Sequence, residues 1–243
     1  MTKYKLNIHT HTNYSDGENT IEELAKASIE LGFMALVVTD HVYWRDHDVS
    51  NSLEKFKQQK IDAMTVSQRV NYPIIVGAEF EVDVREEFLV FGENAILDLL
   101  QQREEWLLAQ KRNKRTPELT IEDIGLIRKK YESAVVLCHP VLIADYKDNE
   151  IKIFSNGALD FIDGYEHYNS GMNMFRSEEK KGYISKFNGL TAFSNSDAHK
   201  IRRLQEGYNF VEEKITTETE LIQYIRNKKP VEMYANDTKV ERT

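Results

Sequence analysis

Apolar and polar positions follow a regular order of short apolar runs and amphipathic stretches along the chain. Apolar residues spaced by three and four predict helices, and short continuous apolar runs predict strands buried on both faces. Strands are expected at 4–9, 33–39, 72–80, 88–92, 134–138, 159–165 and 190–194. Helices are expected at 20–31, 52–70, 95–111, 120–131 and 217–227. This alternation favours an α/β fold with a parallel sheet, either open or closed into a barrel.

The composition is that of a packed globular protein. Of the 243 residues 41% are hydrophobic and 30% charged, which argues against a disordered or fibrous chain. A chain of this length can form one domain if it is an α/β barrel. We therefore expect a single domain over 1–243, with its core motifs in 7–199 and a C-terminal strand, helix and tail in 207–243.

Charge and cysteine content narrow the expected partners and compartment. The net charge of −8 repels nucleic-acid backbones and anionic membranes on average, so nucleic acid is disfavoured as a partner. No apolar stretch is long enough to span a membrane, and a cytoplasmic protein is expected. The single cysteine, Cys138, excludes an intrachain disulfide, and its apolar surroundings, AVVLC, predict an inert core thiol.

Histidines and carboxylates stand where the expected strands end. The carboxyl ends of parallel strands share one face of a sheet or barrel, and active sites of such folds are built there. Side chains that are far apart in the sequence are therefore expected to converge. These are His9, His11, His41, Glu79, His139, Asp197 and His199.

This convergence predicts a metal centre. His9 and His11 are two positions apart, so in an extended backbone both side chains project to one side, and Asp197 with His199 repeats that spacing. A buried imidazole or carboxylate without a partner costs several kcal/mol, so such a cluster must be hydrogen-bonded or hold metal. With Asp16 added, the donors exceed the needs of one ion and lack thiolate, which indicates two or three ions of zinc, manganese or iron.

Polar residues beside the cluster are candidates for substrate binding. The candidates are Glu166, His167 and Asn169, after an expected strand, and Lys200 and Arg202, after His199. Of these, the cationic side chains of Lys200 and Arg202 would bind a phosphate group. Arg45, Arg176 and Arg203 are further cations in or near expected loops.

Several short motifs together carry a resemblance to a known family. HTHTNYSDG is followed in order by TDH, GAEFEV, LCHP, YEHYN and NSDAH, within 7–199. In this combination they are similar to the polymerase and histidinol phosphatase (PHP) family of metal-dependent phosphoesterases. The resemblance implies a distorted (β/α)7 barrel that carries a trinuclear metal centre at the carboxyl ends of its strands.

The resemblance also implies which side chains hold which ion. His9, His11, Glu79 and Asp197 would share one ion, Asp16, His41 and His199 would hold another, and His139 would serve the remaining ion, with Glu79 as a bridge. Many relatives carry a histidine just before the short apolar strand expected at 88–92, whereas this chain has Glu87. A carboxylate can replace imidazole, so Glu87 is a candidate ligand, and two or three ions stay open.

The expected activity is hydrolysis of a phosphate ester by a metal-activated hydroxide. Asp197 or His199 would relay a proton and Asp40 would orient a ligand, so these three are the expected catalytic residues. The favoured substrate is a small phosphorylated molecule or nucleotide, and histidinol phosphate is one candidate that the family suggests. Two further classes of function stay open, a metal-dependent amide or ester hydrolase of the amidohydrolase type and a noncatalytic binding module.

Overall fold

The computed structural model describes residues 2–42, 53–82, 87–111, 119–140, 157–171, 182, 184–187 and 189–240. Its strands are β1 (Tyr4–Leu6), β2 (Leu36–Val38), β3 (His41–Val42), β4 (Ile74–Val76), β5 (Ala78–Glu81), β6 (Glu87–Phe91), β7 (Ala134–Leu137), β8 (Gly164–Asn169), β9 (Thr191–Asn195), β10 (Gly207–Val211), β11 (Glu232–Ala235) and β12 (Thr238–Val240). Its helices are α1 (Ile21–Glu30), α2 (Leu53–Val70), α3 (Glu93–Lys111), α4 (Ile121–Lys130) and α7 (Glu218–Arg226), with short 3-10 turns η2 (Ala158–Asp160) and η4 (Ile201–Arg203).

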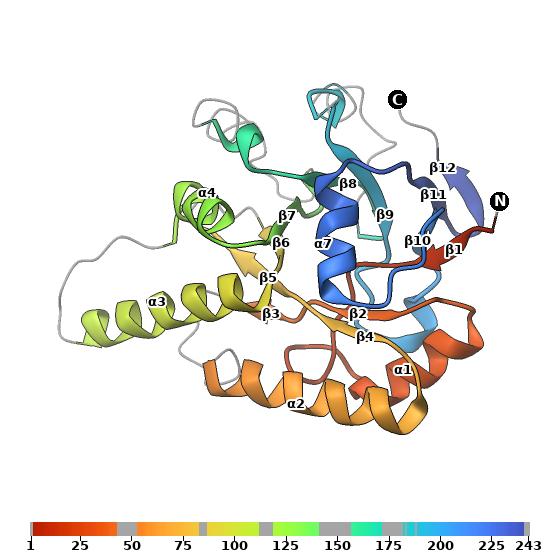
Figure 1. Ribbon diagram of the computed structural model, residues 1–243, viewed down its shortest axis with the longest axis horizontal. Coiled ribbons are helices and arrows are strands. Elements are labelled where there is room, and N and C mark those ends of the chain that lie inside the picture. The colour runs from red at the N-terminus through yellow and green to blue at the C-terminus, as the bar shows by residue number, and fades with distance from the viewer. Residues whose placement is uncertain are drawn as a thin grey trace.

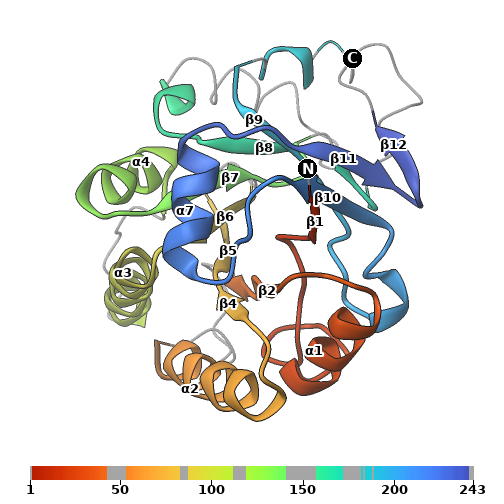
Figure 2. The ribbon, with the colours of Figure 1, turned by 45° about the vertical axis from the view of Figure 1, so that its right-hand side comes forward.

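Strands and helices alternate as a mixed α/β fold. Figure 2 shows α1, α2, α3 and α4 following one another around the outside of the strands, and both views place α1 beside α2 (Figure 1). Three of the helices begin at a threonine whose hydroxyl accepts from the backbone of an acidic residue three positions later: Thr20, Thr120 and Thr217. This reciprocal cap satisfies backbone donors that the first helical turn leaves open.

The sheets are mixed rather than wholly parallel. A six-stranded sheet has the order β3-β5-β6-β7-β8-β9, and in it β6 runs antiparallel to both β5 and β7. The expectation of a parallel sheet was therefore wrong at this strand. A parallel connection needs a dozen or more residues, and the few residues between Glu81 and Glu87 allow only an antiparallel return.

Two other segments also differ from the expected pattern. The apolar run at 72–80 is divided into β4 and β5 at Gly77, where a Cβ atom would stand 2.7 Å from the ring of Phe91. The strand expected at 159–165 begins only at Gly164, because β8 is formed by the polar sequence GYEHYN. Its polar side chains are buried toward the interior, so apolar content did not mark this strand.

The C-terminal part of the chain and the N-terminal strand β1 build an antiparallel sheet with the order β1-β10-β11-β12. Asn236 and Asp237, with φ values of 46° and 61°, make the tight turn between β11 and β12, as the primed hairpin turns require. The sequence predicted β1 within 4–9 and a single strand in the C-terminal part of this sheet, where the structure has β10, β11 and β12. Within the described residues, no helix combines the length and apolar character needed to cross a membrane.

Candidate metal centre

Five histidine rings from four segments meet where the strands end. The ring centroids of His11 and His41 are 4.3 Å apart, those of His11 and His199 4.2 Å, and those of His9 and His139 5.8 Å. His41 lies in β3, while the others follow β1, β7 and β9. The expected convergence of residues that are up to about 190 positions apart in sequence is present in the structure.

The extended segment after β1 places His9 and His11 on the same side. Thr10, between them, faces the other way and donates its hydroxyl to the carbonyl of Val37 at 2.5 Å. Its backbone also forms a parallel bridge with Ala198. This pairing fixes the alternation, so both imidazoles point at the same space, and their ring centroids are 5.0 Å apart.

Glu79 lies at the centre of the cluster and is completely buried. Its Oε2 atom is 3.1 Å from His9 Nε2 and 2.9 Å from His41 Nδ1. Its Oε1 atom is 3.1 Å from His139 Nε2. Burial alone would raise the pKa of this carboxyl, but the surrounding imidazoles, led by His9 and His41, hold it well below its ordinary value.

Asp197 reaches the same centre from the end of β9. Its Oδ1 atom is 2.9 Å from His11 Nε2 and 3.4 Å from His9 Nε2. The expected extended backbone is wrong here, because Asp197 adopts a φ of 49°, in the left-handed region. Aspartate is among the residues that tolerate this conformation, and His199 Nδ1 consequently lies 3.0 Å from the carbonyl of Asp197.

Asp16 and His199 form the outer, more exposed part of the cluster. Asp16 Oδ1 lies 3.2 Å from His199 Nε2 and 3.8 Å from His41 Nε2. Burial raises the pKa of Asp16, but the neighbouring imidazoles outweigh it and lower the pKa to about 2. This carboxylate is half exposed, so solvent reaches the centre from this side.

Glu87 faces the cluster rather than bulk solvent. Its carboxylate is 18% exposed, with Oε2 3.4 Å from His139 Nε2 and Oε1 3.9 Å from His41 Nδ1. Burial and the charge of Glu79 raise the pKa of Glu87 to about 7. Glu87 therefore lies within reach of the His41 and His139 imidazoles, whereas the neighbouring Glu86 lies outside the described residues.

The donor atoms of this cluster fit a bound cation. His9 Nδ1 lies 2.8 Å from the Glu166 carboxylate, and donating a proton there leaves a lone pair on His9 Nε2. Within the described residues, His9 Nε2, both ring nitrogens of His11, Glu79 Oε2 and Asp197 Oδ1 are buried without a hydrogen bond. Lone pairs of nitrogen and carboxylate oxygen that face one another need a cation between them, and this donor set suits zinc, manganese or iron.

Four sets of described side chains bring one donor atom each within 4.8 Å of one another. The sets are His9, Glu79, Cys138 and His139; His11, Asp16, His41 and His199; His9, His11 and Asp197; and His41, Glu79 and Glu87. The first set includes the cysteine that was expected to be an inert core thiol. Burial, helped by the charges of Glu79 and Glu166, raises the pKa of Cys138 well above its ordinary value.

Asp40 is buried behind the metal cluster, and its carboxylate accepts several hydrogen bonds. Its Oδ1 accepts from the backbone and hydroxyl of Ser15 and from the backbone of Thr12. Its Oδ2 accepts from the Thr12 hydroxyl and from Gln59 Nε2, at 2.8 and 2.5 Å. These contacts fill both oxygens, so Asp40 holds the loop that presents Asp16 and is a positioning residue.

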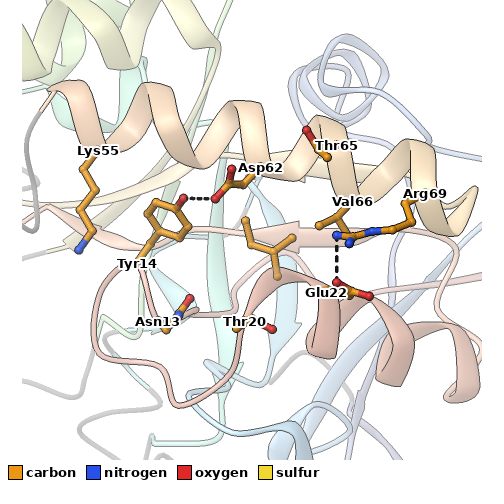
Figure 3. Close-up of a pocket in the computed structure, with 10 residues that line it drawn as sticks. Asn13, Tyr14, Thr20, Glu22, Lys55, Asp62, Thr65, Val66 and Arg69 are labelled. Atoms are coloured by element: carbon orange, nitrogen blue, oxygen red, sulfur yellow. Dashed lines mark hydrogen bonds and ion pairs between the residues drawn. The ribbon is translucent and has the colours of Figure 1, made fainter.

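Helix α2 supports this loop through two side chains that the sequence did not single out. Besides Gln59, Asp62 accepts a hydrogen bond of 2.5 Å from the hydroxyl of Tyr14 (Figure 3). Tyr14 and Asp62 line a cavity of about 490 Å³ between α2 and the segment 13–22. Gln59 is buried on a helix face otherwise occupied by Phe56, Ala63 and Val66. A single polar residue on an apolar helix face was the feature of the sequence that could have indicated its supporting role.

Replacing Gln59 with leucine is expected to weaken metal binding about tenfold, because Asp40 loses a donor and the Asp16 loop is held less firmly. The turnover number at saturating metal should change little. Metal titration followed by steady-state kinetics measures both quantities. Gln68→Leu, at an exposed position of the same helix, is the matched control. Equal effects of the two substitutions would contradict a positioning role for Gln59.

Glu166 is completely buried behind His9 and not at the rim. Its Oε1 lies 2.8 Å from His9 Nδ1 and accepts from Asn195 Nδ2, and its Oε2 accepts from the backbone of His139 and from Asn169 Nδ2. The expectation that Glu166 binds substrate is therefore replaced by a positioning role. A carboxylate behind a metal-binding histidine fixes its tautomer and its orientation.

The substitution Glu166→Gln is expected to lower metal affinity by about 10–100-fold, because an amide group would place a donor against groups that themselves donate. Isothermal titration of the metal-free protein with manganese or zinc measures this. The control Glu232→Gln removes a carboxylate from an exposed ion pair with Lys3. Metal affinity that is unchanged in Glu166→Gln would show that His9 needs no such support.

The other expected substrate contacts differ in accessibility. His167 and Asn169 are 1% and 0% exposed, so the structure gives neither of them a surface from which to contact a substrate. Lys200 forms an exposed ion pair with Glu18, at 2.5 Å. Arg202 is exposed on η4. Arg45 and Arg176 lie outside the described residues.

Arg203, the third cation near this end of the cluster, is engaged within the protein. It donates to Glu206 and to the hydroxyl of Ser170, which in turn donates to the carbonyl of Ser196. Of these three cations, Arg202 is exposed, Lys200 is paired with Glu18 at the surface, and Arg203 is held by Glu206 and Ser170.

Comparison with known proteins matches this arrangement to one family. The PHP domain family model matches residues 7–233. The DNA polymerase/3′-5′ exonuclease PolX of Bacillus subtilis (strain 168) is 27% identical over 249 residues, covering 96% of this chain and 41% of PolX. The chain therefore spans less than half the length of that relative.

Solved structures share the fold at low sequence identity. A two-domain protein from Bacteroides vulgatus, described as containing a predicted PHP-like metal-dependent phosphoesterase, superposes with a TM-score of 0.64 at 16% identity, covering 98% of this chain and 66% of its own. The lesion-specific endonuclease Q of Pyrococcus furiosus gives 0.64 at 17%, covering 96% and 58%. Endonuclease Q has also been solved with a 27-mer duplex carrying an abasic lesion at the active site, and that complex gives 0.58 at 16%, covering 95% and 58%.

These relatives correct the expectation that nucleic acid is disfavoured as a partner. PolX and endonuclease Q are named for action on DNA, and one complex holds a DNA duplex. The expectation was wrong because net charge averages over the whole surface, whereas substrate binding depends on the local charge at the site.

Proposed function

Because the chain belongs to the PHP domain family, whose model matches residues 7–233, we propose that it cleaves phosphate esters at a centre of two or three divalent ions. Family membership makes the chain a hydrolase of phosphate ester bonds, and the proposal concerns how it acts and on what. The observation that carries it is the Glu79 carboxylate, which lies within 3.4 Å of nitrogen atoms of four imidazoles. Bound there, divalent ions lower the pKa of a water molecule and neutralise phosphoryl oxygens.

The proposed ligand sets are those that the family motifs imply, and the close approach of these donor atoms supports them. His9, His11, Glu79 and Asp197 would hold one ion, Asp16, His41 and His199 a second, and Glu79, Glu87 and His139 a third. The exposed side of Asp16 and His199 supports substrate entry there. His199 or Asp197 moves a proton at the reacting phosphate, and Lys200 and Arg202 contribute positive charge at the rim.

We propose further that the whole chain, 1–243, forms one domain and that the three sheets together make the distorted (β/α)7 barrel of the family. Backbone contacts between the sheets support this. Thr10 pairs with Ala198, linking the end of β1 to that of β9, and the amide of Thr39 donates to the carbonyl of Thr10 at 2.8 Å. The amide of Glu79 donates to the carbonyl of Asp40 at 3.1 Å, which links β5 to the segment after β2.

We infer that DNA phosphodiesters belong among the substrates of this site. PolX, which aligns with 96% of this chain, is named as a 3′-5′ exonuclease, and this favours a DNA 3′ end as the first substrate to test. Small phosphorylated molecules, including nucleotides and histidinol phosphate, are the second candidate class. Asp16 is half exposed and His199 is partly exposed, which leaves the centre open to small phosphates as well.

The test is a substrate screen of metal-stripped protein reloaded with manganese, zinc or iron. The panel contains a 3′-labelled single strand, a duplex with an abasic site, mononucleotides, histidinol phosphate, p-nitrophenyl phosphate and amide substrates. We expect cleavage of a phosphorus–oxygen bond that depends on added metal. Fewer than about one bound ion per chain, together with no cleavage of any phosphate ester, would sink the proposal.

A further inference from the structure

The side chain of Cys138 faces the same interior as the metal cluster. Strands β6 and β7 pair antiparallel, with Leu89 opposite Val136 and Phe88 opposite Leu137. One step further, the amide of Cys138 donates to the carbonyl of Glu87 at 2.8 Å. Residues opposite one another in such a ladder project to the same face. Cys138 and Glu87 therefore share the face that carries the cluster.

Cys138 also lies at the depth of the metal ligands. One donor atom from each of His9, Glu79, Cys138 and His139 lies within 4.8 Å of the others, and all four residues are buried. Two of these partners supply an independent sign of a ligand. His9 Nε2 and Glu79 Oε2 are buried, lack hydrogen bonds and stand 3.1 Å apart. The thiol contacts the carbonyl of Val136 at 3.9 Å and hydrogen-bonds to the Glu79 carboxylate.

We propose that Cys138 is a further ligand of the ion held by Glu79 and His139, the deepest of the centre, beside the imidazole of His9. This inference rests on the proposed metal centre and adds a sulfur donor to it. As the metal–sulfur bond forms, the thiol proton leaves to solvent, and no oxidant or reductant takes part. A site with nitrogen, oxygen and thiolate donors suits zinc or cobalt, whereas sites with only carboxylate and imidazole donors also accept manganese.

The proposal divides the ions of the centre by their chemistry. The deep site would hold zinc firmly, while the outer site of Asp16, His41 and His199 has no sulfur within its donor set. We expect zinc to be retained at one site when the outer ion is exchanged for manganese. If Cys138 were an inert core thiol, the two sites would not differ in this way in how firmly they hold zinc.

Cobalt(II) spectroscopy of the metal-free full chain tests the proposal. Because Cys138 is the single cysteine of the sequence, a thiolate-to-cobalt charge-transfer band in the near ultraviolet can arise only from it. Wild-type protein is expected to develop this band with one equivalent of cobalt. Cys138→Ser and Cys138→Ala should lose the band, and Cys138→Ser should bind zinc about tenfold or more weakly.

The outcomes separate this proposal from the proposed function. Wild-type protein that binds cobalt, shown by visible ligand-field bands, but lacks the charge-transfer band would overturn the Cys138 assignment and leave the metal centre standing. Protein that binds no cobalt would overturn the metal centre, and the Cys138 assignment with it. The wild-type spectrum decides the matter even if a cysteine variant fails to fold.

Discussion

Glu79→Gln is expected to lower kcat/KM by about 10³-fold or more, a loss of about 4 kcal/mol of transition-state stabilisation. The substitution keeps the size of the side chain and removes its charge. Glu79 Oε2 lies within 3.4 Å of His9, His11 and His41, and Oε1 lies 3.1 Å from His139. An amide nitrogen at either position would place hydrogen atoms where donors to a cation are required, so more than one ion should be lost.

Metal analysis and steady-state kinetics on the same preparations check this prediction. Bound metal per chain should fall together with kcat/KM. The control is Glu22→Gln, which removes a carboxylate from the surface ion pair with Arg69 and should change neither quantity. Retention of full activity by Glu79→Gln would refute the central place given to this carboxylate.

The main features of the site could be predicted because they follow a local rule. His9, His41 and His139 stand at or just after strand ends. When strands and helices alternate along the chain, these ends meet at one edge, and this holds for an open sheet and for a barrel. Spacing by two residues placed His9 and His11 together correctly. The same rule gave the wrong backbone for Asp197, since left-handed φ values carry no clear sequence signature in an Asn-Ser-Asp run.

The supporting residues could not be predicted, because their roles depend on contacts made across the fold. Glu166 is separated from His9 by 157 positions, and nothing in YEHYN distinguishes a rim residue from a buried one. Gln59 reaches Asp40 from a helix whose other buried residues, Phe56, Ala63 and Val66, are apolar. Strand β6 runs antiparallel because of a short connection, and helical or strand periodicity contains no information on strand direction.

Without metal, the stability of the fold is expected to fall as pH rises from 6 to 9. With metal bound, the trend is expected to be the reverse. In the metal-free state burial would lower the pKa of the buried histidines, but nearby carboxylates raise the pKa of His41 and His139 to about 9 and that of His9 well above 6.5. A raised histidine pKa stabilises the fold fully below the unfolded value of 6.5, and the effect is lost as pH rises toward 9. The raised pKa of Glu87, about 7, acts in the same direction.

The lowered pKa values of the carboxyl groups set the lower end of the pH range in which the metal-free protein is most stable. Asp197 and Glu79 have pKa values below their ordinary range, so their contribution is present above the unfolded pKa and is lost as pH falls below about 4.5. Metal-free protein should therefore be most stable between about pH 4.5 and 6.5. A histidine pKa of about 9 corresponds to about 3 kcal/mol, so the Tm should fall by about 10 °C between pH 6 and 9.

Metal reverses this trend because an ion binds the neutral imidazole and competes with protons. Thermal unfolding of chelated and zinc-loaded protein at pH 6, 7.5 and 9 measures the difference, and the stabilisation by zinc should grow with each step. The variant Tyr208→Phe removes a hydroxyl that donates to Asp237 within the β1-β10-β11-β12 sheet, and it should lower both curves without changing their slopes. A Tm of the chelated protein that is constant from pH 6 to 9 would mean that the imidazoles and carboxylates of the cluster do not interact without an ion. Such a result would contradict the 3.1 Å separation of His139 Nε2 and Glu79 Oε1.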